Sequence, residues 1–261
     1  MHKPTSSTLF SLALPRHVFL NFYPFSLSSL FCSPSPCPNH PRSRPTVPHL
    51  FKLRKTIHPK FENNLNNVIN TLSRDAPQTG FSTSSAGAKD DDSAYGLALC
   101  RGDTSSANCK SCITEAREEI KNRCKYNKGA IIGYDYCLLK YSDENFFGKI
   151  DETNKFYLYN VHTLTNSTLF VAKTNEFLSG LSQKAVQSEK LYYANEEKLC
   201  NEFLTLYGLV QCTRDLSSED CLKCLDDAIR DLPIYSAGKQ GGRTIYGSCN
   251  VRYEIYPFVK D

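Results

Sequence analysis

The chain has 261 residues, of which 40% are hydrophobic, so it is long enough for two packed domains and too apolar for global disorder. Residues 1–60 contain eight of the 31 basic residues and none of the 27 acidic ones. The remainder is therefore mildly acidic, with 23 basic and 27 acidic residues, and gives no electrostatic basis for binding DNA or RNA. Twelve cysteines and no tryptophan indicate a disulfide scaffold in an oxidising compartment.

Residues 1–48 form a Ser-, Pro-, Leu- and Phe-rich leader that we place outside the folded domains. A basic start followed by short apolar stretches is typical of a secretory signal, which the downstream cysteines favour. The acid-free, Ser-rich composition also suits an organelle transit peptide, and an incorrectly assigned first exon is a third interpretation. No uninterrupted apolar run approaches the roughly 18–20 residues of a membrane-spanning helix. We therefore expect no transmembrane span.

An internal repeat divides the rest of the chain into two domains, predicted at 49–150 and 151–261. Four cysteines recur after 112 residues: Cys100, Cys109, Cys112 and Cys137 correspond to Cys212, Cys221, Cys224 and Cys249. Between residues 95–112 and 207–224, nine of 18 positions are identical. Chance does not produce such agreement, so each copy is expected to form one unit of the same fold.

In the first copy, apolar residues at helical spacing predict a helix that contains Phe61, Leu65, Val68, Ile69 and Leu72. A strand is expected from Ala94 to Cys100. Ser105 or Ser106 then caps a second helix, which Gly129 ends. The inward stripe of this helix comprises Cys112, Ile113, Ala116 and Ile120. The segment 130–141 is expected to form two strands or one long bent strand.

In the second copy, the first helix contains Phe177, Leu178 and Leu181. The second helix begins with a capping box, Ser217 to Asp220, and runs to about Leu232, before Pro233. Gly241 and Gly242 predict a turn before a strand. This order of helices and strands predicts an α+β fold with two tandem small disulfide-stapled domains, each an antiparallel sheet with two helices on one face.

Each copy spaces three cysteines as Cys, eight residues, Cys, two residues, Cys. The last two lie three positions apart on one helix face and are available to two different partners. A zinc site built from Cys212, Cys221, Cys224 and Cys249 is an alternative, but structural zinc usually draws on two closely spaced pairs and each copy has one. A thioredoxin-like redox pair would need a βαβ unit. We expect disulfides, with no metal and no cofactor.

Both copies resemble the ginkbilobin-homologous (salt-stress and antifungal) domain of plant cysteine-rich repeat secretory proteins, in its kinase-free two-domain branch. The matching stretches are Tyr95–Cys112 with Gly129–Tyr141, and Tyr207–Cys224 with Gly241–Phe258. The resemblance implies four disulfides: Cys100–Cys109, Cys112–Cys137, Cys212–Cys221 and Cys224–Cys249. It places Cys124 at one end of the family's third bridge, with only Cys32 and Cys37 upstream. Cys200 has no counterpart.

No catalytic constellation is present, since five of the six histidines lie in the leader or at its border and only His162 lies inside a domain. A catalytic His–nucleophile pair would need a histidine beside a nucleophile within a folded unit. We therefore do not expect an enzyme. Together with the cysteines, the resemblance implies a secreted, extracellular protein of the apoplast.

The resemblance also implies a mannose site in the second copy, because the antifungal family member binds mannose through an asparagine, an arginine and a glutamate. Arg243 and Glu254 occupy the last two positions, and Asn160 the first if the register slips by one. Guanidinium and carboxylate groups suit sugar hydroxyls because they form directional, charge-assisted hydrogen bonds. In the first copy these positions hold Ile131 and Ser142, which should not bind sugar this way. The alternative is that Arg243 and Glu254 pair across neighbouring strands.

Two functional hypotheses follow. The first is a secreted extracellular interaction module of plant defence or stress response, which engages a receptor ectodomain or a cell-wall component. The alternative is a mannose-binding, lectin-like antifungal protein that acts through the second domain on a cell-wall or fungal mannose-type glycan. The sequon Asn166-Ser167-Thr168 further predicts glycosylation at Asn166, because it requires only exposure and passage through the secretory route.

Overall fold

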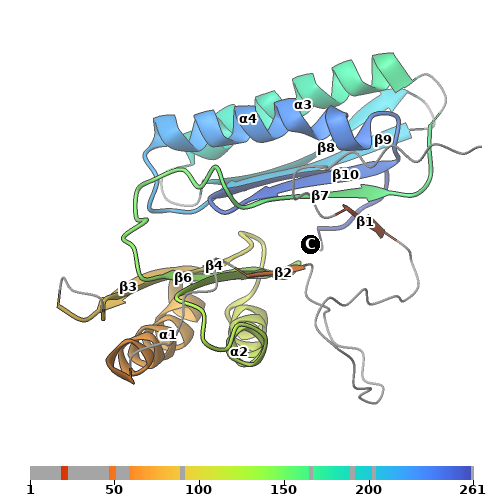
Figure 1. The fold of residues 1–261 in the computed structure, drawn as a ribbon. Helices are drawn as coiled ribbons and strands as arrows, with labels where there is room; N and C mark the ends of the chain where they lie inside the picture. Colours follow the sequence, from red (N-terminus) through yellow and green to blue (C-terminus); the bar gives the residue numbers. More distant parts are fainter. Residues whose placement is uncertain are drawn as a thin grey trace, which may run out of the picture.

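The computed structural model describes residues 59–88, 92–164, 167–188, 192–201 and 204–259, and the backbone of two short N-terminal strands, β1 (Phe19–Phe22) and β2 (Val47–Leu50). Two sheets face each other at the centre, and each carries two helices on its outer side (Figure 1). The resulting order of layers is helices, sheet, sheet, helices.

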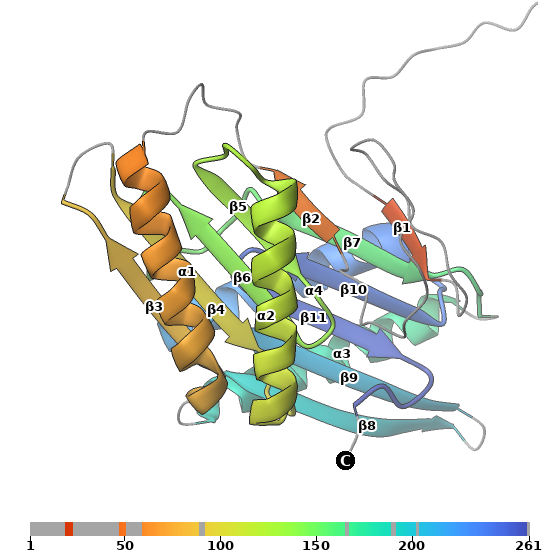
Figure 2. The same ribbon diagram turned by 90° about the horizontal axis from the view of Figure 1, so that it is seen from below.

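The first copy of the repeat builds one sheet and its two covering helices. Its elements are α1 (Pro59–Thr79), β3 (Phe81–Ala86), β4 (Ala94–Cys100), α2 (Ser106–Arg123), β5 (Gly129–Gly133) and β6 (Cys137–Ser142). The strand order is β2-β5-β6-β4-β3, and every neighbouring pair is antiparallel. Both helices lie on the same face of this sheet (Figure 2).

The second copy repeats this arrangement. Its elements are β7 (Lys155–Asn160), α3 (Ser167–Gln187), β8 (Tyr193–Asn201), β9 (Leu204–Cys212), α4 (Ser218–Ser236), β10 (Gly241–Tyr246) and β11 (Cys249–Glu254). The strand order is β1-β7-β10-β11-β9-β8. The predicted α+β fold of two disulfide-stapled domains is confirmed. One parallel strand departs from it: β1, inside the predicted leader, pairs with β7 and covers an otherwise open sheet edge.

The predicted helical faces form the two domain cores. In α1, Phe61, Val68, Ile69 and Leu72 are fully buried, and in α2 the whole predicted stripe is buried. Phe177, Leu178 and Leu181 of α3 are buried as well. The predicted caps are also present, since the hydroxyls of Ser105 and Ser217 each accept a hydrogen bond from the main-chain N–H three residues on.

Three predicted boundaries are wrong, each for a local reason. Helix α2 ends at Arg123 rather than at Gly129, because the chain turns at Tyr126, where φ is +68°. Helix α4 continues through Pro233 to Ser236, since a proline in the last turn removes only one main-chain donor. Gly241 and Gly242 lie inside β10 rather than in a turn. A Cβ atom at Gly241 would lie 1.7 Å from Oε2 of Glu254, so the glycine gives room to that side chain.

Candidate functional site between the two domains

Four disulfides anchor the strands that form the site. They are Cys100–Cys109, Cys112–Cys137, Cys212–Cys221 and Cys224–Cys249, the pairs that the resemblance implied. In each domain, the longer bridge ties the second helix to the start of the last strand. Cys137 and Cys249, from these longer bridges, both border a pocket between the facing sheets.

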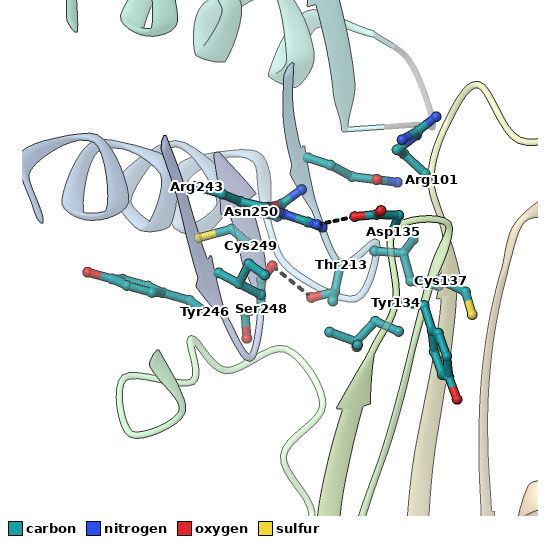
Figure 3. A pocket seen from close by; sticks show the side chains of 15 residues that line it. Arg101, Tyr134, Asp135, Cys137, Thr213, Arg243, Tyr246, Ser248, Cys249 and Asn250 are labelled. Carbon is teal, nitrogen blue, oxygen red and sulfur yellow. Dashed lines mark hydrogen bonds and ion pairs between the residues drawn. The ribbon is translucent and has the colours of Figure 1, made fainter. Parts of the chain in front are cut away.

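This interdomain pocket encloses about 50 Å³. Equivalent positions of the two repeats line it, as expected if the copies pack around an approximate twofold axis. Six such pairs contribute: Leu99 and Gln211, Arg101 and Thr213, Gly133 and Ile245, Tyr134 and Tyr246, Cys137 and Cys249, and Leu138 and Asn250. Asp135, Arg243 and Ser248 complete the lining (Figure 3).

The two copies present different chemistry to this space. Where the first copy has Leu99 and Leu138, the second has Gln211 and Asn250. At a third position, Ile131 of the first copy corresponds to Arg243 of the second. Ile131 packs with Phe156, Leu158 and Ile245 in a small apolar cluster that joins the domains. At these three positions the first copy is therefore aliphatic, and the second is polar or charged.

Arg243 reaches across the interface to the first domain. Its Nη1 lies 2.9 Å from Oδ1 of Asp135, and its Nε donates to Oδ1 of Asn250 at 2.8 Å (Figure 3). Burial lowers the pKa of Arg243 to about 10, and repulsion from the neighbouring Arg252 and Arg101 adds to this effect, although Asp135 opposes it. Asp135, a carboxylate from the other domain, thus stabilises the charged form of this buried guanidinium.

Glu254 and Asn160 lie on the same face of the second sheet as Arg243. Glu254 has no exposed surface, and its Oε1 lies 3.0 Å from the guanidinium of Arg252. Burial raises the pKa of Glu254, although Arg252 counteracts this effect. The side-chain oxygen of Asn160 accepts the main-chain N–H of His162 at 3.0 Å. By strand register, all three proposed sugar-binding residues therefore lie on the sheet face that is turned toward the first domain, and Arg243 contacts that domain.

Further polar contacts join the domains around the pocket. Gln211 donates from Nε2 to the main-chain oxygen of Cys100 at 3.0 Å, within buried surroundings. The Lys140 ammonium on β6 lies 2.6 Å from the carboxylate of Asp151, and both side chains are less than a tenth exposed. The first contact joins residues 111 positions apart, and the second joins β6 to the segment that connects the two domains. The domains are consequently locked by buried hydrogen bonds and ion pairs as well as by apolar packing.

The structure places Asn160, Arg243 and Glu254 on one face of the second sheet. The ion pair between Arg243 and Glu254, suggested above as the alternative to sugar binding, is replaced by other pairs. The ion pair of Arg243 is with Asp135 and that of Glu254 is with Arg252. Sequence reasoning missed Asp135, Gln211 and Asn250 altogether. The sequence did contain a signal for Gln211 and Asn250, because each corresponds to a leucine at the equivalent position of the first copy.

The side chains at the other predicted positions are not part of this site. His162 is exposed, and Cys124 and Cys200 take part in none of the four disulfides. Asn166, Cys32 and Cys37 lie outside the described residues. Within the described part of the chain, no group of three or more His, Cys, Asp or Glu side chains is placed to hold a metal ion. Among the described helices, none combines the length and hydropathy required to cross a membrane.

A model of the salt stress response/antifungal family matches residues 52–144 and 158–256, most of the chain and one segment in each copy. The chain belongs to this family. It is 53% identical over 204 residues to an antimicrobial ginkbilobin-2-like protein of Castanea crenata, and this match covers 78% of the present chain and 84% of the relative. It is 50% identical over 202 residues to cysteine-rich repeat secretory protein 38 of Arabidopsis thaliana, which covers 77% and 79% of the two chains.

The solved structures that resemble this family member support the fold. The tandem DUF26 ectodomain of the Arabidopsis thaliana cysteine-rich receptor-like protein PDLP8 superimposes with a TM-score of 0.73 over 83% of this chain and all of that chain, at 23% identity. The corresponding ectodomain of PDLP5 gives a TM-score of 0.67 at 20% identity. The chain is a secreted, extracellular protein, in agreement with the name of its Arabidopsis relative, a secretory protein.

Proposed function

We propose that this protein is an extracellular interaction module of plant defence or stress response, which acts as one rigid two-domain unit. The observation that carries the proposal is the contact between Arg243 and Asp135. The guanidinium expected to bind mannose is instead buried between the sheets, where it joins the two domains. A group used in this way is not available to a sugar unless the domains separate.

The chemistry of the interface supports the same proposal. The domains bury an apolar cluster and several charged contacts between their sheets, and α1 to α4 are left on the outside. Buried polar contacts favour a single docking geometry, because a shifted interface would leave charges unpaired. We infer that a receptor ectodomain or a cell-wall component binds to the outer surfaces of this unit, without opening it.

Two binding experiments on disulfide-intact protein test this proposal. In surface plasmon resonance against tandem ectodomains of family receptors, we expect saturable binding to at least one. On a glycan array that includes mannose-type glycans, we expect no mannose signal above that of the Arg243→Met variant. Mannose binding that disappears in Arg243→Met would favour the lectin alternative and refute the proposal.

A further inference from the structure

A tight turn follows the second helix of each domain and has the same geometry in both. The backbone angle φ is +68° at Tyr126 in the first domain and +71° at Gly238 in the second. In each domain a buried tyrosine hydroxyl, that of Tyr141 or Tyr253, donates to the main-chain oxygen of the next residue at 3.2 Å. The left-handed conformation is therefore a property of the repeat, and a glycine satisfies it.

A tyrosine at this position is strained, because a Cβ atom in the left-handed region crowds the following carbonyl oxygen. Tyr192, where φ is +43°, provides an internal comparison, since its counterpart Gly80 also has a positive φ of +78°. Tyr192 is partly buried against the core of the second domain, and its hydroxyl lies 3.1 Å from that of Ser218. Tyr126 is instead 61% exposed. Burial explains the strained tyrosine at 192 but not the one at 126.

The turn that carries Tyr126 is also locally basic. Residues 121–128 contain four lysines or arginines and no acid, whereas the equivalent residues 233–240 contain one lysine. Arg123 and Lys128 are engaged with Glu119 and Asp143. Lys125 is exposed, its ammonium lies 5.0 Å from the centre of the Tyr126 ring, and no carboxylate of the described residues lies within 4.0 Å of it.

We propose that Tyr126 and Lys125 form a binding site for an acidic polysaccharide, a chain of uronic acid units. The exposed ring offers a flat apolar surface to the C–H face of a sugar, and the ammonium offers a charge-assisted hydrogen bond to its carboxylate. The turn is held by main-chain hydrogen bonds, so little ordering is required on binding. A protein partner would need a wider apolar patch, but the exposed neighbours of Tyr126 are Asn122, Arg123 and Lys125.

This proposal rests on the proposed function as an interaction module, and it uses the opposite end of β5 from the interdomain pocket. The test is calorimetric titration of disulfide-intact protein with an oligomer of galacturonic acid and with the fully methyl-esterified oligomer. We expect binding to the free acid only, weakened by added salt. Tyr126→Gly should weaken this binding about tenfold or more, as for a central interface aromatic, and Lys125→Gln should weaken it as well.

The matched control is Tyr192→Gly, which changes the other strained tyrosine and should leave the affinity for galacturonate unchanged. Melting temperatures separate binding from stability. Tyr126→Gly should melt at or above the wild-type temperature because strain is relieved, and Tyr192→Gly should melt lower because packing is lost. A lower melting temperature for Tyr126→Gly would overturn the strain argument.

Three binding results overturn the site itself: no binding of galacturonate, equal binding of the methyl ester, or an unchanged affinity in Tyr126→Gly. If one of these results occurs while the protein still binds a receptor ectodomain, the galacturonate site fails and the proposed function stands. The two proposals are therefore tested separately.

Discussion

Replacing Asp151 by asparagine should destabilise the protein strongly, because its carboxylate neutralises a buried lysine between the domains. The Lys140 ammonium lies 2.6 Å from Oδ2 of Asp151, and the side chains are 6% and 8% exposed. Asp151 also accepts hydrogen bonds from the side chains of Thr153 and Asn154, and its main-chain N–H donates to the hydroxyl of Ser248 in the second domain. The substitution therefore acts at the point where the chain passes from one domain to the other.

Removing one partner of a buried ion pair costs about 3–5 kcal/mol, because the other charge is left without compensation. Asparagine retains the shape and some of the hydrogen bonds, so we expect a loss of about 3 kcal/mol in the free energy of unfolding. The matched control is Glu176→Gln, which removes the exposed contact of Glu176 with Lys198 at 3.8 Å. That change should cost less than about 0.5 kcal/mol.

The loss should also depend on pH. Burial opposes ionisation of Asp151, but attraction to Lys140 and the hydrogen bonds it accepts outweigh burial and lower its pKa. A carboxylate with a lowered folded pKa contributes stability that is present above the unfolded value of about 3.9 and is lost as the pH falls through the folded pKa. The difference between wild type and Asp151→Asn should therefore be full at neutral pH and shrink in acid.

Urea denaturation without reductant, followed by tyrosine fluorescence at neutral and acidic pH, measures this difference. A loss below about 1 kcal/mol at neutral pH would show that water reaches Lys140 and that the pair is not buried in solution. A difference that stays constant into strong acid would refute the assignment of the effect to the Asp151 charge.

Three other predictions concern the scaffold. Replacing both cysteines of Cys112–Cys137 by alanine should cost about 0.8 kcal/mol more than doing so for Cys100–Cys109, since the closed loop is longer, with a sequence separation of 25 against 9; urea denaturation of the two variants measures the difference. Gly241→Ala should lower the melting temperature, because the new Cβ would lie 1.7 Å from a carboxylate oxygen of Glu254. The control is Gly133→Ala in the first sheet, where a Cβ meets no atom within 4 Å, and it should leave the melting temperature nearly unchanged. Plant-expressed protein should carry a glycan at Asn166, and an unchanged mass after glycosidase treatment would contradict this.

The sequence was sufficient for features that depend on local pattern. The 112-residue repeat indicated two domains of one fold, and helical spacing identified the buried faces of α1 and α2. The N-terminal caps followed from single serines. These features are predictable because the residues that determine them lie within a few positions of one another.

Features that depend on contacts between distant segments were not predictable in the same way. The sequence of β3, Phe-Ser-Thr-Ser-Ser-Ala, does not alternate clearly between apolar and polar residues. This segment forms a strand because β4 supplies its hydrogen-bonding partners. Gly241 resembles a turn residue until Glu254, on the neighbouring strand, is placed beside it. Arg243 finds Asp135 from 108 positions away, and no local pattern specifies that pair.

Comparison of the two copies on the known fold shows which physical role each position has. Positions that keep their chemistry hold each domain together: Tyr134 bonds to Glu119, and the equivalent Tyr246 bonds to Asp231. Positions that change from aliphatic to polar, such as Ile131 to Arg243, lie where the domains meet. A twofold interface pairs one position of the first copy with a different position of the second, so identical copies would form such a contact twice. Here Arg243 pairs with Asp135 once, because the equivalent positions hold Ile131 and Gly247. The divergence therefore makes the interface asymmetric, with one ion pair and one apolar cluster in place of two ion pairs, whereas the divergence at Tyr126 lies on an exposed turn outside this interface.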